Sequence, residues 1–169
     1  MKRIICLLFS LIFTLLFLVG CSQAEKYNPE PLFTRSFRAL LSGELYGVRT
    51  EVLIEMQAGA QTERTFFAHF LSGSLEGIIV RRDSEGVKIS AGGLEGRSFY
   101  EGGLCYIADL FCAEEYRLVS EDKSTRTATL LAQTRDFEFF VIAGEGGIPR
   151  KFECEGVFSF DVKEFSLIK

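Results

Sequence analysis

Apolar and polar residues alternate along most of the chain beyond residue 36. Between residues 48 and 56, for example, Val52, Ile54 and Met56 alternate with neighbours that are mostly charged. A period of two residues is typical of a strand that buries one of its faces. The same pattern predicts further strands at 37–45, 62–72, 77–82, 87–91, 117–120, 125–133, 137–143, 148–155 and 157–167.

Short segments with turn-forming residues separate these strands. They lie at 58–60, 83–86, 121–124, 134–136 and 144–147 and are rich in Gly, Asp, Glu and Ser. Gly and Asp permit the backbone angles that tight turns require. Strands joined by such short connections predict a meandering antiparallel sheet, which at this length must curl or be covered.

One segment has a different period. Leu104, Ile107, Ala108 and Phe111 follow Gly102-Gly103 and are spaced to share one stripe of a helix. This spacing predicts a helix from 104 to about 115. Its apolar stripe needs a partner, and the concave face of the sheet is available.

The N-terminus has the pattern of an export signal. Lys2 and Arg3 precede an uncharged run from Ile4 to Val19. Sixteen residues of helix at about 1.5 Å each span roughly 24 Å, which is short of the roughly 30 Å hydrocarbon core of a membrane. The run therefore predicts a cleavable signal rather than a transmembrane anchor.

The run ends in a sequence that resembles the lipobox of bacterial lipoproteins, Leu18-Val19-Gly20-Cys21. The resemblance implies that Cys21 receives a thioether-linked diacylglycerol and becomes the mature N-terminus. Two or three acyl chains hold a protein stably on a membrane. We therefore expect an exported protein anchored by lipid to the outer face of the cell membrane.

This interpretation divides the chain into three parts: a signal peptide at 1–20, a lipidated tether at 21–31 and a single β-rich domain at 32–169. Removal of the signal leaves 17 Lys and Arg against 23 Asp and Glu, a net charge of −6. An acidic domain lacks the basic surface that nucleic-acid binding requires. It also lacks a polybasic patch for anionic lipids, so we expect the covalent lipid to provide membrane attachment.

The combination of features resembles the LolA/LolB-like superfamily, which includes lipid carriers and germination-specific lipoproteins. The resemblance rests on the lipobox, the strand pattern, one central helix and a C-terminal hairpin that runs from Gly147 through Gly156 to Val162. It implies a strongly curved, unclosed antiparallel half-barrel with helices at its mouth.

The phenylalanine residues allow two interpretations. Fourteen of the 17 Phe lie beyond the signal, and in strands 62–72 and 137–143 apolar residues point to both faces. A helix or loop that covers the second face explains this pattern, because Phe is mostly a core residue. The alternative is an open apolar groove for an acyl chain, for which the candidate lining residues are Phe67, Ile107, Phe111, Phe139 and Val141.

Residues that carry chemistry are scarce. His69 is the only histidine, and it lies in an apolar strand without a nucleophile motif beside it. Charged residues such as Glu51 and Glu138 alternate with apolar ones, as on a solvated sheet face. We therefore expect no catalytic residues, no cofactor and no metal site.

Cys105, Cys112 and Cys154 remain in the mature chain. Seven residues of helix would hold Cys105 and Cys112 about 10.5 Å apart along the axis, too far for a disulfide. A bond from Cys154 to one of them and three buried free thiols are both compatible with the sequence.

We therefore expect a mainly β chain of the α+β type. Its architecture is a strongly curved, meandering antiparallel sheet or half-barrel with one main helix at about 104–115. The predicted function is a non-enzymatic scaffold or partner-binding module at the cell envelope. The alternative function is a carrier of a lipid or another hydrophobic ligand in a LolA-like groove.

Overall fold

The computed structural model describes residues 26–58, 64–98 and 103–168, and the structural statements below concern these residues. The strands are β1 (Phe37–Leu45), β2 (Val48–Ala58), β3 (Arg64–Phe70), β4 (Ile79–Asp83), β5 (Gly86–Ala91), β6 (Leu94–Ser98), β7 (Glu115–Asp122), β8 (Thr127–Gln133), β9 (Glu138–Gly144), β10 (Pro149–Cys154) and β11 (Phe158–Leu167). The helices are α2 (Glu30–Phe33), α3 (Tyr106–Asp109) and the 3-10 turns η2 (Gly73–Leu75), η3 (Gly103–Cys105) and η4 (Glu145–Gly147).

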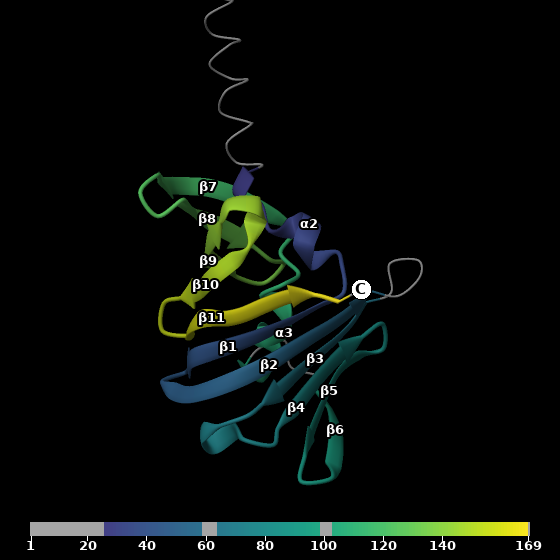
Figure 1. Ribbon diagram of the computed structural model, residues 1–169. Coiled ribbons are helices and arrows are strands. Elements are labelled where there is room, and N and C mark those ends of the chain that lie inside the picture. Colours follow the sequence, from purple (N-terminus) through teal and green to yellow (C-terminus); the bar gives the residue numbers. More distant parts are fainter. Residues whose placement is uncertain (1–25, 59–63, 99–102, 169) are drawn as a thin grey trace, which may run out of the picture.

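All of these strands form one antiparallel sheet in the order β6-β5-β4-β3-β2-β1-β11-β10-β9-β8-β7. The first strand therefore pairs with the last, with Phe37 opposite Leu167 and Leu45 opposite Phe158. This pairing joins two meanders, β1–β6 and β7–β11, into a curved sheet that stays open between β6 and β7 (Figure 1). The predicted fold class, a mainly β unclosed half-barrel, is confirmed.

The period of two residues has the expected structural meaning. In β2, Val52 and Ile54 are fully buried and Met56 is 3% exposed, whereas Glu51 and Glu55 face away from the core. Strand β1 begins and ends at the predicted residues, Phe37 and Leu45. The buried residues of successive strands share the concave face, and this face forms the core.

Strand β6 was missing from the sequence prediction. Its hairpin with β5 turns at Gly92 and Gly93, whose φ angles are +57° and +84°. Positive φ at both central residues is the mark of a type I′ turn, for which Gly is favoured. The short Leu-Glu-Gly-Arg-Ser run that follows has too little apolar alternation to be recognised without its partner strand.

The predicted helix at 104–115 is wrong in length. A 3-10 turn, η3, leads into the four-residue helix α3, and the chain enters β7 at Glu115. The amide of Glu114 already donates to the carbonyl of Gln133 at 2.8 Å, so pairing with β8 takes over where the helix was expected to continue. The apolar stripe correctly identified Ile107, Ala108 and Phe111 as buried, but burial alone does not fix the length of a helix.

The segment before β1 packs on the sheet. Tyr27 is 1% exposed, Pro29 is buried and Phe33 in α2 is 2% exposed. Tyr27 and Pro29, which the sequence analysis placed in the tether at 21–31, therefore pack against the sheet. The signal, Cys21 and the rest of the tether lie outside the described residues.

Aromatic side chains fill the space between the sheet and these short helices. Phe111 lies 4.9 Å from Phe37, 5.0 Å from Phe33 and 5.0 Å from Phe152, measured between ring centroids. Figure 1 shows α3 inside the curve of the sheet. Among the described helices, none has the length and apolar character to span a membrane.

Candidate functional site

Four of the five predicted groove residues lie in the packed core. Ile107, Phe139 and Val141 are between 0 and 1% exposed, and Phe111 is 2% exposed. All four belong to one core cluster, in which Phe111 and Phe139 both lie against the ring of Phe152, at centroid distances of 5.0 and 6.4 Å. Ile107, Phe139 and Val141 are closed into this core, whereas the edge of Phe111 also borders a small cavity described below.

Phe67 lies apart from the other four. In β3 the buried face carries Phe66, Ala68 and Phe70, so Phe67 points to the convex face. There its ring lies 5.7 Å from the guanidinium of Arg81. The sequence analysis assigned Phe67 to the groove because both faces of β3 carry apolar residues. Only the position of β3 in the sheet shows which of these faces is the concave one.

A small amphipathic cavity, which we call the mouth pocket, opens beside the core. It has a volume of about 360 Å³ and is lined by Met56, Arg64, Phe66, Arg82, Asp83, Ser84, Phe111 and Cys112. A neighbouring cavity of about 200 Å³ shares Arg64, Phe111 and Cys112 with it. The floor of the mouth pocket is apolar, and its rim carries two guanidinium groups.

The two guanidinium groups of the mouth pocket have different surroundings. Arg82 of β4 forms an ion pair with Asp109 and so connects α3 to the sheet. Arg64 at the start of β3 is exposed and takes part in no ion pair among the described residues. Arg64 is therefore the charge that is available to an anionic group.

Cys112 at the rim is a poor nucleophile. The thiol is exposed on one side, but the protein packed against its other side desolvates it and raises its pKa above the ordinary value of 9.0. Arg82 and Arg64 lower this pKa without cancelling the increase. At neutral pH the group is therefore a protonated thiol, whereas nucleophilic attack requires the thiolate.

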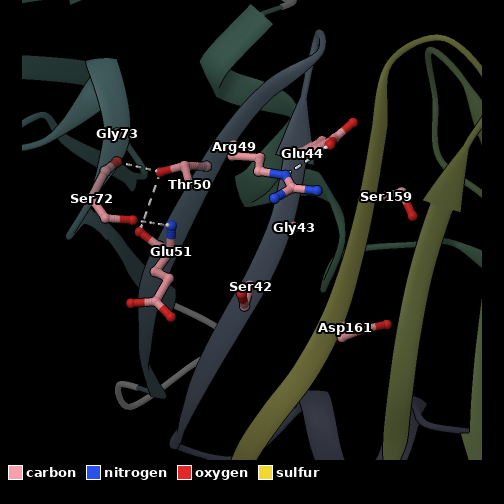
Figure 2. Close-up of a pocket in the computed structure, with 10 residues that line it drawn as sticks. All are labelled: Ser42, Gly43, Glu44, Arg49, Thr50, Glu51, Ser72, Gly73, Ser159 and Asp161. Carbon is pink, nitrogen blue, oxygen red and sulfur yellow. Dashed lines mark hydrogen bonds and ion pairs between the residues drawn. The ribbon is translucent and has the colours of Figure 1, made fainter.

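A second, larger concavity lies on the outer face of the sheet, and we call it the outer depression. Its volume is about 710 Å³, and each residue that lines it is polar or a glycine: Ser42, Gly43, Glu44, Arg49, Thr50, Glu51, Ser72, Gly73, Ser159 and Asp161 (Figure 2). These residues come from β1, β2, β11 and the loop that follows β3. No signal in the sequence pointed to this site, because its residues are far apart in the chain and read as ordinary solvated strand positions.

Backbone contacts hold the rim of the outer depression in place. The Thr50 hydroxyl donates to the carbonyl of Ser72 at 2.9 Å, and the Glu51 amide donates to the Ser72 hydroxyl at 2.9 Å. Gly73 has φ +77° and lies so close to β2 that an added Cβ would be 2.2 Å from the carbonyl oxygen of Arg49. The loop after β3 is thus fixed against β2 at a defined distance.

The charges of the outer depression are partly neutralised. Arg49 lies 3.3 Å from Glu44, and Asp161 lies 3.3 Å from Lys163 just beyond the depression. The carboxylate of Glu51 forms no ion pair within the described residues. The depression therefore presents hydroxyl groups, the carboxylate of Glu51 and two solvent-exposed ion pairs. All of these groups can form hydrogen bonds with a polar partner.

Residues that could carry chemistry are scattered over the described part of the chain. Within the described residues, no three His, Cys, Asp or Glu side chains are grouped so that they would hold a metal ion. His69 lies next to Phe67, 6.3 Å between ring centroids, and is not part of either cavity. Cys112 and Cys154 are both free thiols, and the side chain of Cys105 lies outside what the structure describes.

Comparison with known proteins supports the fold alone. No protein family matches the chain, and no curated protein matches it. The structure of an uncharacterized conserved protein from Thermus thermophilus is 15% identical and superposes with a TM-score of 0.53 over 83% of each chain. This superposition shows a similar chain path and carries no information on activity.

Two structures of MucB are also similar, with lower scores. MucB alone is 18% identical with a TM-score of 0.49, and MucB in complex with MucA(peri) is 16% identical with a TM-score of 0.46. The chain spans 58% and 56% of the length of these MucB chains. Neither superposition reaches a score from which we draw a functional argument.

Proposed function

We propose that this chain is a membrane-anchored exported lipoprotein whose β-domain is a non-enzymatic, partner-binding module at the cell envelope. The observation that supports this function over a carrier is the close packing of the predicted groove residues. Ile107, Phe111, Phe139 and Val141, which would line an acyl-chain groove, are at most 2% exposed. Binding then takes place on the outer surface of the domain.

The outer depression is the part of the surface best suited to a protein partner. It is lined by hydroxyl groups, carboxylates and one guanidinium, and a surface loop is fixed along its rim. Polar surfaces of this kind form hydrogen bonds and ion pairs at the rim of protein interfaces. A partner with polar and cationic groups matches this lining, because Glu51 is a carboxylate without an ion-pair partner among the described residues.

The membrane attachment in this proposal rests on the lipobox at Leu18–Cys21. Tyr27, the second of the residues that the structure describes, is buried against the sheet. Few residues would then separate the lipid at Cys21 from the folded domain. A domain held this close to the bilayer meets partners that lie in or on the same membrane.

Photo-crosslinking in intact cells tests the proposal. A benzophenone amino acid placed at Ser42, in the outer depression, should give a discrete protein adduct on irradiation. The same group at Arg135, an exposed position between β8 and β9, serves as the matched control. Equal adducts at both positions, or no adduct at Ser42, would contradict partner binding at the outer depression.

The mouth pocket supports a second candidate function, the binding of an anionic amphiphile such as a fatty acid. Its floor of Met56, Phe66 and Phe111 suits an apolar chain, and Arg64 at the rim suits a carboxylate or phosphate. A volume of about 360 Å³ accommodates part of an acyl chain. Native mass spectrometry should then detect bound palmitate in the parent protein and lose it in Arg64→Glu, whereas the partner-binding function predicts no bound lipid in either.

A further inference from the structure

The two edges of the sheet differ in how they are protected. At the β7 edge a bulge between Leu118 and Ser120 disturbs the strand, and Tyr27 donates a hydrogen bond to the Glu121 carboxylate at 2.9 Å. At the other edge, β6 pairs with β5 in unbroken register and has no other strand partner among the described residues. A regular, unprotected edge strand is a template for pairing with another strand.

The described side chains of strand β6 are open to solvent. Residues 94–97 are all exposed, and the side chain of Leu94 is 80% exposed. Figure 1 shows β6 at the outer margin of the sheet, away from α2 and α3. An added Cβ on Gly96 would meet no atom within 4 Å, so the centre of the strand is free of neighbouring side chains.

The hairpin geometry determines which backbone groups of β6 face outward. A two-residue turn closes on a hydrogen-bonded pair, here Ala91 and Leu94, and hydrogen-bonded and non-hydrogen-bonded pairs alternate from there. Gly96 is therefore bonded to β5 through both its N–H and its C=O. The N–H and C=O groups of Glu95 and Arg97 point away from β5 and lack a strand partner.

The charges on β6 are only partly neutralised within one chain. Arg97 lies directly opposite Lys88 of β5, and like charges in opposite positions destabilise a strand pair. One carboxylate, that of Glu85, lies 3.1 Å from Lys88 and 3.6 Å from Arg97 and serves both cations. Glu95 forms no ion pair among the described residues. A second carboxylate beside Arg97 would relieve this imbalance.

We propose that β6 pairs with β6 of a second copy of this chain, in antiparallel register centred on Gly96. In this register Gly96 faces Gly96 of the second copy, and Glu95 of each copy faces Arg97 of the other. Glu95 and Arg97 are the residues whose N–H and C=O groups point away from β5. Each Glu95–Arg97 pair between the two copies can therefore form two backbone hydrogen bonds. The carboxylate and guanidinium of each pair lie side by side on the convex face.

The register is selective because β6 is self-complementary about Gly96 alone. A register centred on Glu95 places two carboxylates opposite each other, and one centred on Arg97 places two guanidinium groups opposite each other. The two-fold symmetry of the resulting contact is that of an isologous dimer. The inference goes beyond the proposed function and does not depend on it, because the outer depression lies on β1, β2 and β11.

Reversing the charge of residue 95 or residue 97 in full-length chains tests the proposal. Two copies with different affinity tags are co-expressed, extracted in mild detergent and purified through one tag. The amount of the other copy that co-purifies measures how far the two copies pair. Wild-type copies should co-purify. When both copies carry Glu95→Arg, or both carry Arg97→Glu, recovery should fall roughly tenfold, because like charges then face each other.

Mixing the two variants provides the decisive measurement. A copy with Glu95→Arg carries two cations on β6, and a copy with Arg97→Glu carries two anions, so the mixed pair should recover to the wild-type level. This recovery also shows that each variant is folded. Arg135→Glu, a charge change on a distant turn, should leave pairing unaffected.

Three results would overturn the pairing of β6 with itself. Wild-type copies that do not co-purify would exclude a dimer, and variants with two like charges that co-purify as well as wild type would place any dimer contact elsewhere. The third is a mixed pair that fails to recover although both variants keep the melting temperature of the wild type. Co-purification of only the wild-type and mixed pairs would support the register centred on Gly96.

Discussion

The ring of Phe33 stands edge-on to the ring of Phe111, with 5.0 Å between their centroids and 78° between their planes. Phe33 ends α2 near the N-terminus, and Phe111 follows α3 in the middle of the chain. Two segments that cover the concave face thus meet above the sheet, and Phe111 also contacts Phe37 of β1. Phe111 therefore contacts both the α2 segment and strand β1, and so connects the two covering segments to the sheet.

Removing the Phe111 ring should destabilise the whole domain. Phe111→Ala is expected to lower the free energy of unfolding by about 3–5 kcal/mol, because it leaves a cavity among the rings of Phe33, Phe37, Phe66 and Phe152. Phe140→Ala is the matched control, since Phe140 is 44% exposed on the convex side of β9 and its loss should cost about 0.5 kcal/mol or less. Urea unfolding of both variants measures the difference, and equal losses would contradict the role of Phe111.

A charged residue should have opposite effects at the two phenylalanines that the sequence assigned to one groove. Phe139→Asp places a carboxylate without a partner in the core, where Phe139 is 1% exposed, and should leave the domain unfolded. Phe67→Asp places it on the convex face beside Arg81 and should be tolerated. Circular dichroism of the two variants distinguishes these outcomes. A folded Phe139→Asp variant would indicate an open groove and favour a carrier.

Gly43 is required by the close approach of β1 and β11. An added Cβ would lie 1.9 Å from the carbonyl oxygen of Ser159, so Gly43→Ala should force the strands apart and cost about 1–3 kcal/mol. Gly96→Ala in β6 is the control, because the Cβ there meets nothing within 4 Å of the same chain, and both variants are compared at a dilution at which the protein is monomeric, so that pairing through β6 does not contribute. If the two variants melt at the same temperature, the β1–β11 contact is looser than described.

The reactivity of Cys112 should depend on pH in a predictable direction. Desolvation raises the pKa of this thiol above 9.0, so the thiolate fraction, and with it the rate of alkylation by iodoacetamide, should stay low at neutral pH and rise at pH values above 9.0. Arg82→Gln removes a cation that lowers this pKa and should slow alkylation further. Mass spectrometry of the Cys112 peptide measures the rate, and fast alkylation at neutral pH would show that the thiol is solvated.

The lipid anchor remains a prediction from the sequence. Cys21→Ala removes the thiol that would accept the diacylglycerol, so the variant should accumulate as unprocessed precursor and incorporate no radioactive palmitate. Cys112→Ala is the matched control, because it removes a free thiol of the folded domain and should leave labelling unchanged. Labelling of the Cys21→Ala variant at the wild-type level would show that the lipobox assignment is wrong.

The sequence alone determined the class of the fold and the faces of the long strands. The alternation in β1 and β2 is a local signal. The polarity of each residue indicates whether it faces solvent or the core, and no knowledge of the rest of the chain is needed. The same local signal identified the buried residues Ile107 and Phe111. It also gives the export signal and Cys21 as predictions, since such signals are contiguous in the chain.

Tertiary structure decided the features that depend on pairing between distant segments. Strand β6 exists because β5 offers it a partner, and the helix around Ile107 is short because Glu115 pairs with Gln133. The outer depression joins residues as distant as Ser42 and Ser159, whose strands become neighbours only when β1 pairs with β11. Sheet hydrogen bonds connect residues at any separation in the chain, so a local pattern indicates that a residue is in a strand but does not specify its neighbours.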